Sequence, residues 1–398
     1  MSFSLRTAVL LTATALTVGG VAACSSDSSS TAGGGTDSGG VGCITDFDAN
    51  TDYFPDKQAV EYAANFDIEY HNSYQVLTVR QPGQPDEAYV LTRCGAPAPE
   101  LTGDLAGAQQ VTTPVTDLFT ESTTHLPSLE ALGRLDALTG FASADYVYSE
   151  TARAHITGDG VTQFATAGQV DAESVVAQGP QAFVTGGFED PAFPVIERAG
   201  IPVLDNYDWL ETDPRGRAEW IKFFAALTGT EKQATETFDG IVADYDRYTT
   251  MAANKTPVAI VPGLPYQGGW SVPLASYSNE LYATARITHP WMSEPGTGSL
   301  QTDLETVFAR AGDAPVSISN SADTTKAAAI AAEPRLAEFA AFRDGQVWTS
   351  SNRVTDAGAI DIYEQGVLRP DLVLADLIAI AHPDLMPGHE FTFYRRLQ

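Results

Sequence analysis

Short apolar runs alternate with amphipathic segments between residues 105 and 210. The apolar runs predict strands at residues 115–119, 137–141, 182–185 and 203–205. The segments between them predict helices at residues 127–132, around 173–177, and at 192–199. Strands that alternate with helices in this way indicate βαβ units and a mainly parallel sheet.

The middle of the chain is helical. Trp220, Phe223 and Leu227 share one face of a helix that begins after Asp213-Pro214 and ends at Gly229. A second amphipathic segment, residues 231–251, predicts a helix roughly 30 Å long. A helix of that length between two α/β halves would act as a rigid strut.

The second half repeats the strand–helix rhythm. Strands are predicted at residues 258–261, 315–318 and 346–349 and in the closing FTFYRRL, and helices at 281–286, 303–311, 334–342 and 370–381. Residues 43–96 differ, because two strand-like runs at 68–79 and 88–92 flank a turn-rich segment. These residues predict an antiparallel β module.

The first residues have the pattern of a secretory signal. Arg6 precedes a short apolar run, and small residues lead to Cys24. Val21-Ala22-Ala23-Cys24 is similar to a bacterial lipobox, in which the cysteine carries the lipid. We therefore expect a signal peptide at residues 1–23 and a flexible Ser/Gly tether at 24–42. An ordinary secretory peptide with an incidental cysteine is the alternative.

The cysteine count and the net charge limit the possible disulfides and binding partners. If Cys24 is lipidated, Cys43 and Cys94 remain, and an exported protein with two cysteines is expected to form one disulfide; two separate buried thiols are the alternative. The net charge of −29 argues against binding to nucleic acid. No run after the signal is long and apolar enough to predict a membrane span.

Four segments together resemble one family of binding proteins. They are ESTTHLPSLEALGRLDALTGFASADYV, AGIPVLDNYDWLETDPRGRAEWIKFFAALTG, YQGGWSVPLASYSNELYATA and YEQGVLRPDLVLADLIAIAHPDL. Their order and spacing resemble the substrate-binding lipoproteins of ABC importers, in the helical-backbone class (class III) that takes ferric siderophores and cobalamin. The likeness covers roughly residues 105–398, and the cysteine-containing module resembles an extra piece of one branch.

The resemblance implies an α/β fold with two lobes, each a mainly parallel sheet flanked by helices, joined by a long rigid helix. The expected boundaries are 43–104 for the extra N-terminal β module, 105–228 for lobe one, 229–255 for the linking helix and 256–398 for lobe two. It further implies a lipid-anchored monomer outside the cytoplasmic membrane. This monomer captures a ferric siderophore between its lobes and delivers it to an ABC permease, with no catalysis and no cofactor.

Candidate ligand-binding residues follow from the loops at the carboxyl ends of strands. In lobe one these are Thr123, Thr124, His125 and Tyr146. Their hydroxyls and imidazole are suited to hydrogen bonding with ligand oxygens, and helix capping is the alternative for the threonines. Glu189 is expected to contact the permease, with a plain surface charge as its alternative.

The candidates in lobe two are mainly aromatic. They are Tyr266, Gly269, Trp270, Trp291, Arg353 and Tyr363. Aromatic rings suit an apolar ligand surface, glycine allows close backbone approach, and arginine suits an anionic chelate. Trp270 as a core residue and Arg353 as a surface ion-pair partner are the alternatives.

Other functions stay open at this point. Cobalamin and haem are the nearest alternative ligands, and a related branch binds bare Zn²⁺ or Mn²⁺ through His and carboxylates. The sequence has no G-x-S-x-G, H-E-x-x-H or P-loop motif, which argues against a secreted hydrolase. A structural or adhesive lipoprotein is the remaining alternative.

Overall fold

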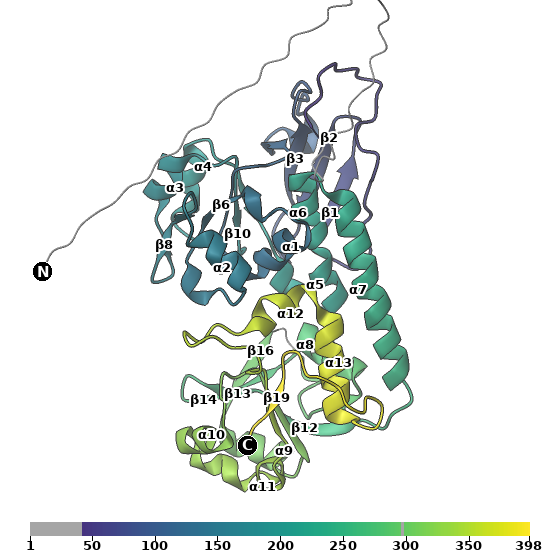
Figure 1. Ribbon diagram of the computed structural model, residues 1–398, viewed down its shortest axis with the longest axis vertical. Coiled ribbons are helices and arrows are strands. Elements are labelled where there is room, and N and C mark those ends of the chain that lie inside the picture. Colours follow the sequence, from purple (N-terminus) through teal and green to yellow (C-terminus); the bar gives the residue numbers. More distant parts are fainter. Residues whose placement is uncertain (1–41, 296–297) are drawn as a thin grey trace, which may run out of the picture. The chain divides into compact units, whose positions relative to one another are not determined.

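The computed structural model describes residues 42–295 and 298–398 (Figure 1). The predicted signal peptide, the predicted lipidation site at Cys24 and the predicted tether as far as residue 41 lie outside the described residues. Within the described residues, no helix combines the length and the apolar character that crossing a membrane requires.

The N-terminal β module is one four-stranded sheet. Its strands, in spatial order, are β1 (Phe66–Tyr70), β2 (Tyr74–Val79), β3 (Glu87–Arg93) and β4 (Gln109–Thr113). The first three run antiparallel, whereas β4 pairs parallel with β3 and extends the module past residue 104. The single run predicted at 68–79 was wrong, because the turn-forming residues His71-Asn72-Ser73 fold it into a hairpin.

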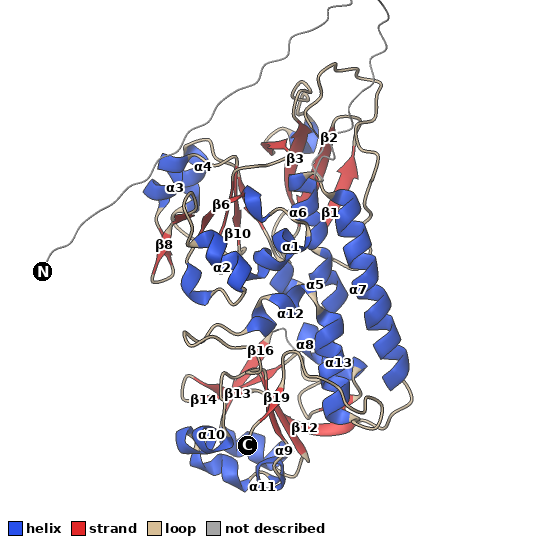
Figure 2. Ribbon diagram, viewed as in Figure 1, coloured by secondary structure: helices blue, strands red, loops and turns tan. Residues whose placement is uncertain are grey.

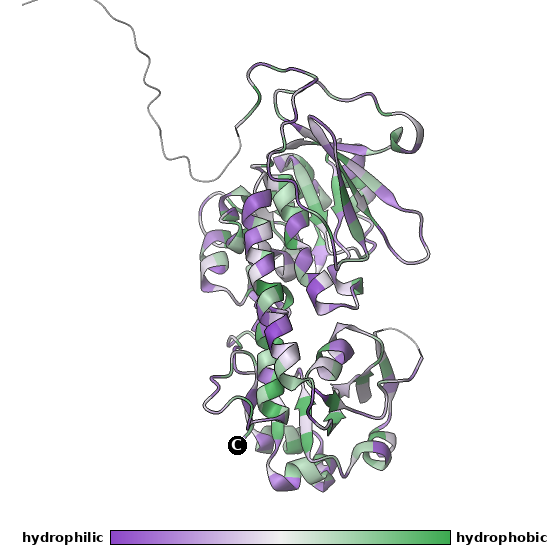
Figure 3. Ribbon diagram, turned by 90° about the vertical axis from the view of Figure 1, so that its right-hand side faces the viewer, coloured by the Kyte–Doolittle hydropathy of each residue, from purple (hydrophilic) through white to green (hydrophobic). Residues whose placement is uncertain are grey.

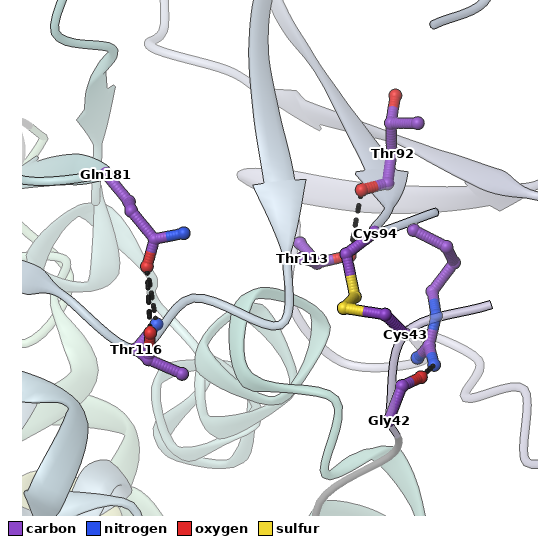
Figure 4. The surroundings of a disulfide bond; sticks show 8 residues. Gly42, Cys43, Thr92, Cys94, Thr113, Thr116 and Gln181 are labelled. Carbon is purple, nitrogen blue, oxygen red and sulfur yellow. Dashed lines mark hydrogen bonds between the residues drawn. A yellow bond between two sulfur atoms is a disulfide. The ribbon is translucent and has the colours of Figure 1, made fainter. Parts of the chain in front are cut away.

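Cys43 and Cys94 form the expected disulfide (Figure 4). The backbone supports the bond, since Ile44 N donates to Cys94 O (2.8 Å) and Cys94 N donates to Thr113 O (2.8 Å). The start of the described chain is thereby fixed to the ends of β3 and β4. The alternative of two separate thiols is excluded.

Lobe one is built on a parallel five-stranded sheet. The strand order is β11 (Val203–Asp205), β10 (Ala182–Thr185), β5 (Leu118–Thr120), β6 (Leu138–Phe141) and β7 (Thr162–Gln163). Its helices are α1 (Leu126–Ala131), α2 (Glu150–Ile156), α3 (Ala172–Gln178) and α4 (Phe193–Arg198), and a small hairpin joins β8 (Ala165–Thr166) to β9 (Gln169–Val170). The sequence analysis missed α2, and it missed β7–β9, whose two residues each are too few to show a period.

Three helices follow lobe one, namely α5 (Pro214–Glu219), α6 (Ile221–Thr228) and α7 (Glu231–Ala252). Asp213 caps α5 by accepting from Arg215 N, and Gly229 ends α6 in the left-handed conformation. The long α7 is amphipathic, and polar and apolar residues alternate along it in Figure 3. Its apolar side packs on α6 and on α13 (Pro370–Ala381).

Lobe two contains a second mainly parallel sheet. Its order is β15 (Ile287–Thr288), β12 (Val258–Pro262), β17 (Val316–Ser319), β18 (Val347–Thr349) and β19 (Arg395–Arg396), of which only β19 is antiparallel. An antiparallel sheet of β13 (Leu264–Tyr266), β14 (Gly269–Pro273) and β16 (Ser299–Thr302) was not predicted. The remaining helices are α8 (Tyr277–Thr284), α9 (Leu304–Ala311), α10 (Lys326–Ala332), α11 (Ala340–Asp344) and α12 (Gln365–Leu368).

Helices flank both large sheets (Figure 2). Separate apolar clusters form around the two sheets, with Phe223 and Phe224 in the first and Leu374 and Phe393 in the second. The predicted fold class, α/β with mainly parallel sheets flanked by helices and a long helix, is confirmed.

Candidate functional site

A cavity of about 740 Å³ lies where three parts of the chain meet. The module, both lobes and the helices between them belong to a single compact unit. The residues around the cavity are Gln81, Pro82, Trp209, Leu210, Glu211, Thr212, Gly263, Leu264, Ser271, Pro273, Ala275, Ser276, Tyr277, Ser278, Tyr282, Gly298, Ser299, Ser319, Asn320 and Tyr363. The volume is within the range of small-molecule sites in proteins.

Aromatic rings form much of the cavity wall. Trp209 follows β11 of lobe one, stacks on Phe188 at 4.8 Å and donates from Nε1 to Gly186 O (3.0 Å). Tyr277 and Tyr282 come from α8 of lobe two, and Tyr363 donates its hydroxyl to Asn320 O (3.3 Å). Trp209 and Tyr363 are 37% and 41% exposed, so their rings are available to a ligand.

The polar groups of the cavity are mostly uncharged hydroxyls and an amide. Ser276 is the N-cap residue of α8, yet its hydroxyl caps nothing and has no hydrogen-bond partner among the described residues. Asn320 follows β17, and its Oδ1 accepts from the Tyr394 hydroxyl (2.9 Å). A buried hydroxyl without a partner costs free energy, which a ligand acceptor or donor at this point would offset.

The cavity lining carries almost no charge. Among the described lining residues, Glu211 carries the one carboxyl group, which accepts from Ala64 N (2.9 Å), Asn65 N (3.0 Å) and Trp220 Nε1 (3.1 Å). Burial raises the pKa of Tyr363 to about 12, and it raises the pKa of Tyr282 further, so both phenols are neutral at physiological pH. The described lining contains no Lys or Arg.

Arg217 and Arg353 both make structural contacts. Arg217 lies 4.5 Å from the Tyr277 ring centroid and pairs with Asp208 at 3.5 Å. It lines a narrow pocket of about 20 Å³ that shares Tyr277 and Tyr282 with the cavity. Arg353, a predicted ligand contact, pairs with the buried Asp361 at 3.0 Å and does not border the cavity. An anionic ligand therefore meets no free positive charge on the described walls.

Three predicted site residues are core residues. His125 is 1% exposed, bonds through Nδ1 to Thr120 Oγ1 and packs on Phe224, and burial lowers its pKa to about 4. Trp270 donates to Pro262 O (2.9 Å), and Trp291 is completely buried. Their burial corrects our placement of these side chains at the cleft and agrees with the alternative for Trp270.

The other predicted residues have different positions. Tyr363 borders the cavity, whereas Tyr146 and Tyr266 are exposed but outside its lining, at 68% and 49%. Gly269 begins β14 and is packed against Thr302 O, so even a Cβ atom would be crowded there. In the Ser122–His125 turn, Ser122 accepts from Thr124 N, so Ser122 supplies the cap.

Thr123 and Thr124 remain partly exposed in that turn without lining the cavity, and Glu189 is exposed in the loop after β10.

The sequence did not identify Gln81, Trp209, Tyr277 or Tyr282 as cavity residues. Trp209 had a usable signal, because it follows the carboxyl end of a predicted strand. Gln81 had none, since its position depends on packing between distant segments.

A desolvated carboxyl in lobe one gives a prediction about the pH dependence of stability. Glu121 follows β5 and accepts from Gly186 N (2.6 Å); burial raises its pKa to about 7, and Asp190 and Asp205 add to the rise. The folded state therefore holds this proton more tightly than the unfolded chain, whose pKa is about 4.3. The contribution of this group to folding stability is therefore complete at a pH below the unfolded pKa, and it is lost as the pH rises through the folded pKa of about 7.

We expect Glu121→Gln, which keeps an acceptor for Gly186 N, to reduce the loss of folding stability between about pH 5 and about pH 8. The measurement is the free energy of urea unfolding at about pH 5 and about pH 8. Glu173→Gln on the exposed start of α3 is the control and should behave as the parent. An unchanged pH dependence in Glu121→Gln would contradict the prediction.

The comparisons with known proteins agree with this architecture. The family model described as periplasmic binding protein matches residues 121–354, so the chain belongs to that family. An uncharacterized lipoprotein of Methanocaldococcus jannaschii is 23% identical over 325 residues, which is 77% of this chain and 75% of the relative.

Solved structures show the same fold at low identity. A periplasmic binding protein of Veillonella parvula has a TM-score of 0.58 at 12% identity, covering 78% of this chain and 99% of its own. The periplasmic heme-binding protein HutB of Vibrio cholerae has a TM-score of 0.52 at 14% identity, and the match covers 65% of this chain and 99% of HutB. Helicobacter pylori CeuE with Ni(II) bound has a TM-score of 0.56 at 13% identity, and the match covers 71% of this chain and 88% of CeuE.

The family is one of binding proteins, in agreement with the prediction of a protein without catalytic activity. Within residues 42–295 and 298–398, no group of three or more His, Cys, Asp or Glu side chains is arranged to hold a metal ion.

Proposed function

We propose that this protein is the substrate-binding lipoprotein of an ABC importer and that it captures a ferric siderophore in the 740 Å³ cavity. The observation that carries the proposal is the cavity itself, an aromatic, hydroxyl-rich space between the lobes of a periplasmic binding protein. A ferric chelate presents apolar faces and peripheral oxygens, which match rings and hydroxyls.

The charge of the lining narrows the ligand class. With neutral phenols and no described cation, the site suits an uncharged or cationic complex, such as a ferric trihydroxamate, better than an anionic ferric tricatecholate. Haem carries two propionates and fits the same lining less well. Cobalamin, which lacks a comparable anionic periphery, is the second candidate that this observation favours.

Delivery requires a membrane partner. The lipoprotein relative supports our expectation of a lipid anchor at Cys24, which would hold a monomer at the outer face of the cytoplasmic membrane beside the permease. Glu189, exposed in the loop after β10, is our proposed permease contact, because a carboxylate there is free to pair with an arginine.

A fluorescence titration tests the ligand class. Purified full chain is titrated with a cyclic ferric trihydroxamate, a ferric tricatecholate, haem, cobalamin and Zn²⁺, and tryptophan emission is followed. Saturable quenching by the trihydroxamate supports the proposal, and saturation by cobalamin alone assigns the protein to the second candidate. Saturation only by Zn²⁺, or by none of the five while circular dichroism shows folded protein, contradicts the siderophore assignment.

Trp209→Ala is expected to weaken affinity for the bound chelate about fivefold to tenfold, because the ring's stacking on a ligand face is lost. The matched control is Trp348→Phe, a half-buried tryptophan on β18 that packs on Phe391 away from the cavity. Isothermal titration calorimetry measures both variants. Equal affinities in Trp209→Ala and the parent would show that the ligand does not touch this ring.

A further inference from the structure

The N-terminal β module reaches the ligand cavity. Gln81 and Pro82 lie in the loop between β2 and β3, and both border the cavity together with residues of the two lobes. The module precedes the part of the chain that matches the family model, residues 121–354. It therefore adds a cavity wall that the family match does not contain.

We propose that this module is a specificity element, and that Gln81 contacts the ligand and selects for polar, uncharged groups on its periphery. The inference rests on the proposed function, since it concerns the same cavity. A carboxamide offers one acceptor and two donors with no net charge. Among the described residues, none forms a hydrogen bond with the Gln81 side chain, so its full capacity is available.

A short series of hydrogen bonds holds the loop at the cavity. Glu211, itself a cavity residue, accepts from Asn65 N (3.0 Å). Asn65 O in turn accepts from Arg80 N (2.8 Å), the residue immediately before Gln81. Asn65 therefore connects the loop to the cavity wall, with one hydrogen bond to Glu211 and one from Arg80.

The loop is also internally constrained. Arg80 pairs with Asp86 at 3.2 Å across its base, and Gln84 N donates to Gln81 O (3.0 Å) in a turn. Pro82 and Pro85 fix two further backbone angles. A constrained loop loses little conformational entropy when a ligand binds, which suits a selective wall.

The module itself is anchored to the helices that follow lobe one. The Glu219 carboxylate, fully buried, accepts from Glu61 N (2.9 Å), Tyr62 N (2.7 Å) and Ala63 N (2.8 Å). In addition, Asp205 N, at the end of β11, donates to the Tyr89 hydroxyl (3.0 Å) on β3. These contacts make the module a fixed part of the binding unit.

Paired variants in one loop test the inference. Gln81→Ala removes the amide at the cavity, and Gln84→Ala removes the same side chain three residues away, outside the lining. Gln81→Trp fills the space instead. The full chain of each is titrated by calorimetry with a cyclic ferric trihydroxamate and with cobalamin, and thermal midpoints are recorded alongside.

For whichever probe the parent binds, we expect Gln81→Ala to lose about threefold to tenfold in affinity, the effect of one hydrogen bond. Gln81→Trp should lose more affinity, whereas Gln84→Ala should bind with the affinity of the parent. The thermal midpoints of all three variants should equal that of the parent. Parent-like affinity in both Gln81 variants overturns the specificity role and leaves the proposed function standing. A parent chain that binds neither probe overturns the specificity role together with the assignment of an uncharged ligand to this cavity.

Discussion

Glu219→Ala is expected to lower the free energy of unfolding by about 3–5 kcal/mol, because it breaks a buried ion pair and its hydrogen bonds. The carboxylate is 0% exposed and pairs with Lys222 Nζ at 2.6 Å. Without it, Lys222 loses its buried counter-charge and three backbone N–H groups of residues 61–63 lose their acceptor. Buried groups left in this state are strongly destabilising.

Urea unfolding followed by circular dichroism measures this change. Glu236→Ala is the control, because that carboxylate on α7 is largely exposed, and it should stay within about 0.5 kcal/mol of the parent. A loss of under about 1 kcal/mol in Glu219→Ala would show that the module does not depend on this anchor. Hydrogen exchange should also show faster exchange of the amides of residues 61–63 in the variant.

Removing the disulfide is expected to cost about 3–4 kcal/mol in the double variant Cys43→Ser, Cys94→Ser. The two cysteines are 51 residues apart, so the bond closes a long loop and restricts the unfolded chain considerably. In the folded state the bond connects the start of the described chain to the edge where β3 and β4 end.

The parent protein provides the comparison for this variant. Urea unfolding of the parent with and without a thiol reductant should reproduce the difference, and the reductant should not affect the double variant. If the double variant and the oxidised parent unfold at the same urea concentration, the bond does not stabilise the module.

The sequence predicted most of the parallel strands of the two lobes, but not β7 or β15. Runs such as residues 182–185 and 203–205 are buried on both faces, so they read as short continuous apolar segments between turns. Asp213, Pro214 and Gly229 marked helix ends by local chemistry that acts within a few residues. These features depend little on the rest of the fold.

The site was harder to predict, because burial is a property of the assembled lobes. Trp270 and Trp291 look like ligand-binding aromatics, but Trp270 follows a hairpin turn into β14, and both rings pack in the core of lobe two. Tyr277 and Tyr282 lie five residues apart on α8, and their position at the cavity depends on how α8 packs against α5 and α13. Gln81 lies at the cavity because the β2–β3 hairpin packs against a segment far away in sequence, as the hydrogen bond from Asn65 N to Glu211 shows.

A cavity whose described lining carries no free cation is expected to select an uncharged or cationic ferric chelate. Calorimetry of the full chain, with a neutral ferric trihydroxamate and an anionic ferric tricatecholate under identical low-salt conditions, tests it most directly. We expect at least about tenfold tighter binding of the trihydroxamate, since a buried anion without a counter-charge is costly. Equal or tighter binding of the tricatecholate would show that the charge of the cavity lining does not select the ligand.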